Sequence, residues 1–117
     1  MALGIQIKRI YEDPDDADGY RILVDRLWPR RVKKETAMLD EWNKDIAPSV
    51  ELRKWFDHKE NRFAEFAKLY SEELRLHAKE LSRIRKLSKT KKVSLLYGAK
   101  NPGINHAVVL LNVLTHQ

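Results

Sequence analysis

The chain of 117 residues contains no cysteine. Disulfide bonds, thiolate metal sites and a cysteine nucleophile are therefore excluded. The absence of cysteine also fits the reducing environment of the cytoplasm, where disulfides are rare.

Long hydrophobic runs are missing as well. No stretch approaches the roughly 20 apolar residues that a helix needs to cross a bilayer. The opening MALGIQIKRI lacks the basic region and apolar core of a signal peptide. We therefore expect a soluble cytoplasmic protein without a membrane partner.

Familiar catalytic and cofactor motifs are also absent. The chain has no GxSxG, no P-loop and no GxGxxG. Its histidines lack metal-ligand spacing such as i, i+4, so we expect neither a metal site nor a cofactor. One of them, on the apolar stripe of a predicted helix, is expected to be a core residue. The four are His58, His77 (the core candidate), His106 and His116.

What the chain does have is charge, unevenly distributed. It carries 23 basic and 17 acidic side chains, a net charge of +6. Five acids fall within residues 12–18 and six bases within residues 83–92. A basic protein favours encounters with anions such as nucleic acid or phosphorylated metabolites. The run RIRKLSKTKK has no interleaved aromatics and no helix-turn-helix context, so a solvated helix end is favoured over a nucleic-acid site.

The hydrophobic pattern predicts a single α/β domain over residues 1–117, with a largely parallel sheet of three to four strands flanked by helices. Strands are expected at 5–10, 20–28 and 93–97. Helices are expected from Ser49, over 61–87 with an interruption near residues 76–77, and over 104–114. Residues 32–47 are consistent with either a helical turn or an irregular edge strand.

Two of the predicted strands end in distinctive residues. DRLWPRR surrounds Trp28 with Asp25 and arginines, and YGAKNPGINHA leads into a helix whose first turn presents free backbone N–H groups. Ligands of open parallel sheets bind beyond the carboxyl ends of the strands. Arginine forks beside a helix N-terminus suit phosphate or carboxylate. The two loops therefore predict a shared anion site.

Each of these residues also has a purely structural interpretation. Arg26 could form an ion pair with its neighbour Asp25. Trp28 and Pro29 are typical of a packing plug at a strand end, and the arginines that follow are typical of a solvated turn. His106, at the start of a helix, could be a capping or packing residue.

Three motifs in order, VDRLWPR, DEWNKDIAPSVELRKWF and LLYGAKNPGINHAVVL, resemble the YeaO-like family within the larger domain-of-unknown-function 488 group. The resemblance spans the chain from IKRIY to the last helix. It implies a small cytoplasmic α/β protein and carries no established activity. The matching positions are Arg26, Trp28, Pro29, Arg30, Lys44, Asp45, Ala47, Pro48, Ser49, Arg53, Trp55, Phe56, Tyr97, Ala99, Lys100, Asn105, His106 and Ala107.

The chain departs from the resemblance at three positions. The wider group often has cysteines where this chain has Tyr97 and Asn105, so thiol chemistry cannot operate here. The family usually has glycine where this chain has Arg31, which adds a Cβ and a charged side chain to a turn that could use positive φ.

The leading hypothesis is a small anion-binding domain that acts on or binds a phosphorylated or carboxylated metabolite. Whether it is an enzyme stays open; His106 is the candidate for proton transfer because histidine titrates near pH 6.5. The alternatives are a nucleic-acid-binding or regulatory protein using residues 83–92, and a dimeric interaction module, with the oligomeric state open. The expected ligand-binding residues are Arg26, Arg30, Arg53, Tyr97, Lys100, Asn105 and His106.

Overall fold

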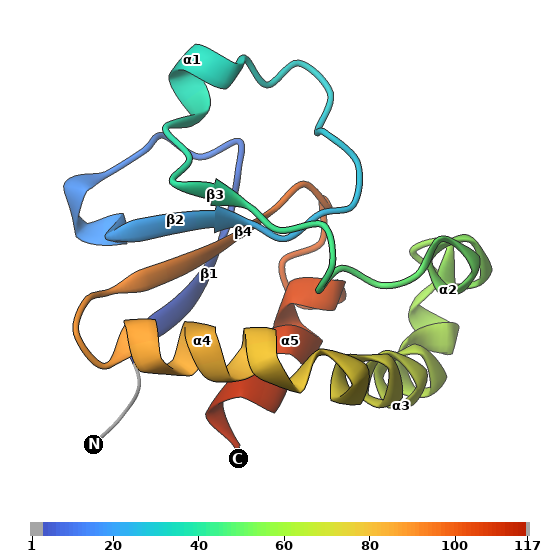
Figure 1. The fold of residues 1–117 in the computed structure, drawn as a ribbon. Coiled ribbons are helices and arrows are strands. Elements are labelled where there is room, and N and C mark those ends of the chain that lie inside the picture. Colours follow the sequence, from blue (N-terminus) through green and yellow to red (C-terminus); the bar gives the residue numbers. More distant parts are fainter. Residues whose placement is uncertain (1–3, 117) are drawn as a thin grey trace.

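The computed structural model describes residues 4–116 and contains one four-stranded sheet. The strands are β1 (Ile5–Arg9), β2 (Tyr20–Leu23), β3 (Glu41–Trp42) and β4 (Val93–Tyr97), in the order β1-β4-β2-β3. Every pairing is parallel, so all carboxyl ends meet at one edge (Figure 1). The predicted α/β fold with a parallel sheet is confirmed.

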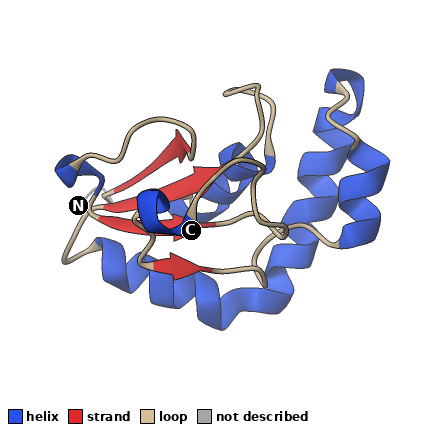
Figure 2. Cartoon of the chain, turned by 90° about the horizontal axis from the view of Figure 1, so that it is seen from above, coloured by secondary structure: helices blue, strands red, loops and turns tan. Residues whose placement is uncertain are grey.

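The helices are α1 (Lys34–Ala37), α2 (Val50–Phe56), α3 (Phe63–Leu74), α4 (Ala78–Ser88) and α5 (His106–Thr115). Short 3-10 turns are η1 (Asp16–Asp18), η2 (Glu60–Arg62) and η3 (Arg75–His77). Helices α4 and α5 pack on one face of the sheet, and the segment containing α1 covers the other (Figure 1). Helices α2 and α3 lie beyond the carboxyl ends of the strands (Figure 2). They thus border the edge of the sheet where ligands of open parallel sheets bind.

Side chains along the two central strands, β2 and β4, point alternately to the two faces of the sheet and form two apolar layers. Ile22 and Leu95 are paired in register, fully buried, and belong to the large cluster that the helices complete. Leu23 and Leu96, one position on, belong to a smaller cluster on the other side with Trp28. Because successive side chains point to opposite faces, strands covered on both sides need apolar residues at every position. This requirement explains the continuous apolar run of Ile22, Leu23 and Val24.

Side-chain hydrogen bonds fix the two helices that border the carboxyl edge. Ser49 is the N-cap of α2, and its Oγ accepts a hydrogen bond from the Leu52 backbone N–H at 3.2 Å. Glu73 of α3 in turn accepts from the backbone N–H and hydroxyl of Ser49, at 2.8 and 2.6 Å. Tyr70, buried in α3, donates its hydroxyl to the carbonyl of Ile46. These bonds tie α3 to the start of α2.

The predicted helix over 61–87 is interrupted where expected: α3 ends at Leu74, η3 follows, and α4 begins at Ala78. The second strand is shorter than predicted and ends at Leu23, because the chain leaves the ladder well before Pro29. Residues 32–47 contain both a helical turn, α1, and an edge strand, β3. His77 is half-buried at the start of α4 rather than in the core.

None of the helices within residues 4–116 has the length and apolar character of a membrane-spanning segment.

Arg31 adopts φ 64°, the left-handed conformation that the family's usual glycine would adopt without strain. An L-residue pays about 1–2 kcal/mol for this backbone conformation. We expect Arg31→Gly to be more stable than Arg31→Ala by about 1 kcal/mol, although glycine gains unfolded-state entropy. Urea denaturation with an unchanged m-value measures this difference. Both variants lose the same charge, so equal stabilities would show that the turn carries no strain.

Candidate functional site

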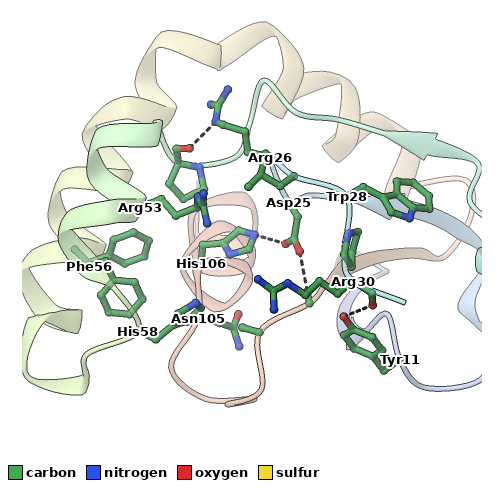
Figure 3. Close-up of a pocket in the computed structure, with 16 residues that line it drawn as sticks. Tyr11, Asp25, Arg26, Trp28, Arg30, Arg53, Phe56, His58, Asn105 and His106 are labelled. Carbon is green, nitrogen blue, oxygen red and sulfur yellow. Dashed lines mark hydrogen bonds and ion pairs between the residues drawn. The ribbon is translucent and has the colours of Figure 1, made fainter. Parts of the chain in front are cut away.

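A pocket of about 430 Å³ opens at the carboxyl edge of the sheet, where the loops after β2 and β4 face α2 and α3 (Figure 3). Both loops that the sequence singled out contribute to it, because parallel β2 and β4 are neighbours. We call it the arginine pocket. Its lining residues are Tyr11, Asp25, Arg26, Leu27, Trp28, Pro29, Arg30, Pro48, Arg53, Phe56, His58, Phe66, Gly98, Ala99, Asn105 and His106.

Asp25 and His106 meet at the centre of the pocket (Figure 3). Asp25 Oδ2 accepts a hydrogen bond from the Gly98 backbone N–H at 2.9 Å. His106 Nε2 lies 3.0 Å from Asp25 Oδ1 and also 3.0 Å from the carbonyl oxygen of Val24. Both neighbours are acceptors, so Nε2 carries a proton. Nδ1 is consequently the ring nitrogen that remains for other partners.

The Nε2–H bond is directed at the Val24 carbonyl, although Asp25 Oδ1 is equally near. Oδ1 is buried, and within the described residues it has no hydrogen bond. It lies 3.0 Å from His106 Nε2 without a hydrogen bond to it. Gly98 is needed here because a Cβ at that position would stand 2.9 Å from Asp25 Oδ2. The carboxylate is therefore held by the loop after β4 and lies beside the first residue of α5.

The three arginines of the pocket have different environments. Arg26 does not pair with Asp25: its Nε and Nη2 donate to the carbonyls of Pro48 and Ala47 at 2.9 and 3.2 Å. Its guanidinium therefore holds the loop before α2, and points away from His106 (Figure 3). Arg30 and Arg53 instead extend toward the middle of the pocket (Figure 3). Among residues 4–116, no acidic side chain lies within ion-pair distance of any of the three.

Aromatic rings form the wall opposite the sheet. Phe56 of α2 stacks on Phe66 of α3 with ring centroids 4.2 Å apart, and His58 follows at 6.2 Å from Phe56. On the sheet side, Trp28 packs edge-on against Trp42 at 5.2 Å, as the packing interpretation expects. The pocket thus combines cationic groups with an apolar wall.

The remaining sequence-predicted residues occupy other roles. Asn105 lines the pocket, but its side chain caps α5 by accepting from the Val108 N–H at 3.1 Å and donates to the Asn101 carbonyl at 2.8 Å. Tyr97 is buried in β4, and burial raises the pKa of its hydroxyl. Neither Tyr97 nor the exposed Lys100 is among the lining residues. Five of the seven predicted ligand-binding residues therefore line the pocket, and Tyr97 and Lys100 do not. The five are Arg26, Arg30, Arg53, Asn105 and His106.

Sequence reasoning missed several lining residues. Phe56 and Phe66 lie on the apolar faces of α2 and α3, a position that is typical of core residues. Tyr11 donates its hydroxyl to the Arg30 carbonyl at 2.8 Å, a contact between segments 19 residues apart. His58 follows the end of α2 in a left-handed conformation, φ 55°. No local pattern identifies either of these two as a site residue.

Among described residues, no group of three metal-ligating side chains lies close enough together to hold a metal ion.

Comparison with known proteins identifies relatives along nearly the whole chain. An uncharacterised protein of Escherichia coli, YeaO, is 48% identical over 112 residues, covering 96% of this chain and 97% of the relative. Uncharacterised proteins of Mycobacterium bovis and Mycobacterium tuberculosis are each 42% identical over 110 residues, covering 94% of this chain and 92% of theirs. No solved structure gives a significant match.

A family model also matches residues 4–117, and its description is the inactive DUF488-N3 subclade. The match extends over all of the described sheet and all of the helices that border the arginine pocket. The resemblance to YeaO-like proteins is thereby confirmed. The chain belongs to the DUF488-N3i family.

Proposed function

We propose that the arginine pocket binds a small organic anion, a carboxylate or phosphate attached to an apolar or planar body. One observation carries this proposal: Arg30 and Arg53 extend into one cavity without an acidic partner among residues 4–116. Asp25 is the single carboxylate on the lining, and Gly98 and His106 already contact it. The charged lining is therefore mainly cationic, with three arginines against one carboxylate, and this favours an anionic ligand.

The size and walls of the pocket define the ligand class further. A volume of about 430 Å³ lies within the range of about 300–1,000 Å³ that is usual for small-molecule sites. Guanidinium forks bind carboxylate or phosphate through paired hydrogen bonds. Phe56 and Phe66 line the pocket although they are 5% and 1% exposed, so they offer the rest of the molecule a small apolar contact. A purely inorganic anion would leave this contact unused.

Binding is proposed here rather than catalysis. The chain has no thiol, and the positions where the wider group often has cysteines are occupied by Tyr97, a strand residue, and Asn105, a helix cap. The family model describes its subclade as inactive, in agreement with that loss. His106 then serves as a polar contact: with Nε2–H held by Val24, its Nδ1 is the nitrogen that can meet a ligand.

The first test compares phenyl phosphate and benzoate with benzyl alcohol as ligands in a thermal-shift assay. A ligand at 100 times its dissociation constant stabilises the folded state by about 2.7 kcal/mol, which such an assay detects. We expect the anions to stabilise the protein and the neutral alcohol to have no effect. If benzyl alcohol stabilises as much as the anions, the arginines do not select the ligand.

The second test replaces Arg53 by glutamine and measures the affinity for phenyl phosphate by calorimetry. Loss of a charge-assisted hydrogen-bond pair should weaken binding about tenfold or more, since 1.4 kcal/mol is a factor of ten. Arg75→Gln is the matched control, because Arg75 is an exposed arginine outside the pocket. Equal weakening by both substitutions would indicate a general charge effect and contradict the proposed site.

The basic end of α4 is the weaker candidate for anion binding. Arg83 forms ion pairs with Glu41 and Glu80, and Arg85 donates to the carbonyls of Leu114 and Val113. Lys91 lies over the Tyr20 ring, so three of the six bases in residues 83–92 serve internal contacts. The proposal accordingly rests on the arginine pocket.

A further inference from the structure

A second cavity lies between α2 and the outer stripe of α3, and shares no lining residue with the arginine pocket. It is an open groove of about 630 Å³. Leu52 forms part of its floor, while Trp55 and Leu76 stand at its margin with 40% and 84% of their surface exposed. Two large apolar side chains thus remain in solvent beside a ready-made groove. We call this surface the glutamate groove.

The name comes from four carboxylates that line the groove: Glu51, Glu65, Glu72 and Glu73. No lysine, arginine or histidine is among its lining residues. Glu73 holds Ser49, whereas the other three are in no ion pair within the described part of the chain. The protein has a net charge of +6, yet all the charged side chains that line this groove are acidic; a basic group, Arg62, lies over the Trp55 ring at the margin. Its partner should carry the opposite sign.

The spacing along α3 and η3 indicates the shape of that partner. Glu65, Leu69, Glu72 and Leu76 are separated by four, three and four residues, so they lie along one stripe. At 1.5 Å per residue this stripe is about 16 Å long, the length of three helical turns. A groove between two helices, with alternating apolar and charged positions, is the surface that an amphipathic helix recognises.

A second copy of this chain does not fit the groove. Two identical grooves placed face to face would bring like charges together, which opposes an isologous dimer. The basic end of α4 has the right charge, but Ile84 is fully buried and Leu87 is packed against the core. That segment therefore has no apolar anchors to offer.

We propose that the glutamate groove docks a cationic amphipathic helix of about three turns from another protein. Leucine-like anchors of the partner pack on Leu52, Trp55 and Leu76, and lysine or arginine side chains meet Glu65 and Glu72. The interaction is independent of the arginine pocket, so either proposal can fail without the other.

The test uses a labelled synthetic peptide of about 14 residues with leucine at every third or fourth position and lysine or arginine between them. Fluorescence anisotropy measures its affinity for the full chain, and NMR shift changes locate the contact. We expect saturable binding with shifts confined to α2, α3 and η3. A scrambled peptide of the same composition should bind at least about tenfold more weakly, because its apolar residues no longer share one face. Equal binding of the scrambled peptide would overturn the proposal.

Variants separate the two parts of the recognition. Leu76→Ser removes an exposed anchor, and Glu65→Lys with Glu72→Lys reverses the charge; each should weaken binding about tenfold or more. Glu35→Lys, an exposed acid on α1, is the control and should leave the affinity unchanged. Equal effects of Glu35→Lys and the groove variants, shifts outside the groove, or self-association through this face in sedimentation would each overturn the proposal.

Discussion

Asp18→Asn is expected to lose about 3–5 kcal/mol of unfolding free energy, because it leaves a buried cation unpaired. The Asp18 and Arg21 side chains are each only 4% exposed. Asp18 also accepts from Lys8 Nζ, at 2.9 and 3.0 Å for its two oxygens. Asparagine keeps the shape but removes the charge that both bases face. Urea denaturation gives the difference.

Asp16→Asn is the matched control for this prediction. Asp16 is an exposed acid in the same 3-10 turn, so its loss should change stability by less than about 0.5 kcal/mol. A similar loss for both variants would mean that general charge in this loop, rather than the buried pair, stabilises the protein.

The same carboxylate makes the effect depend on pH. Burial opposes ionisation of Asp18, but hydrogen bonds from Lys8, the Asp15 backbone and Arg21 outweigh it and lower the pKa below the ordinary 3.8. A depressed folded-state pKa gives stability that is present above the unfolded value and lost as pH falls through the folded one. The gap between wild type and Asp18→Asn should therefore be constant near neutrality and shrink below pH 3.8. A gap independent of pH would contradict the ionised pair.

Phe66→Ala is expected to cost about 3–5 kcal/mol, the usual range for deleting a buried aromatic ring. Phe66 is 1% exposed and stacks between Phe56 at 4.2 Å and Tyr70 at 5.6 Å. It also lines the arginine pocket, so the deletion enlarges the cavity and removes part of its apolar wall. Denaturation measures the stability, and calorimetry with phenyl phosphate measures the accompanying loss of affinity.

Leu76→Ala provides the comparison, since Leu76 is 84% exposed and its truncation should cost less than about 0.5 kcal/mol. The same measurement on Leu76→Ala tests whether groove variants at this position remain folded. If Phe66→Ala costs no more than Leu76→Ala, the aromatic stack does not hold α2 against α3, and the pocket wall is not a fixed surface.

Local pattern was sufficient for most of the secondary structure. The period of 3.6 predicted α3 and α4 and the break between them, because each helix must bury one stripe whatever it packs against. Ser49 predicted the start of α2, since a cap acts within a few residues. The continuous apolar run of β2 predicted a strand covered on both faces, and hence a parallel sheet.

The same patterns predicted where the site would lie, but not which groups each of its residues contacts. Parallel strands place the loops after β2 and β4 at one edge, and the arginine pocket is there. Arg26 and Arg53 look equivalent in sequence, yet one binds backbone carbonyls and the other extends into the cavity. Which acceptors a long side chain can bind depends on the groups that the fold brings near it.

The sequence by itself determined the fold class, the helix boundaries near their caps and the carboxyl edge as the place for a ligand, because these follow from local periodicity and strand direction. Only the tertiary structure decided that Asp25 meets His106 rather than Arg26, that Phe56 and Phe66 form a pocket wall, and that four glutamates line one groove. Phe56 and Phe66 are 10 positions apart and Asp25 and His106 more than 80, and no local rule determines which such residues meet in space.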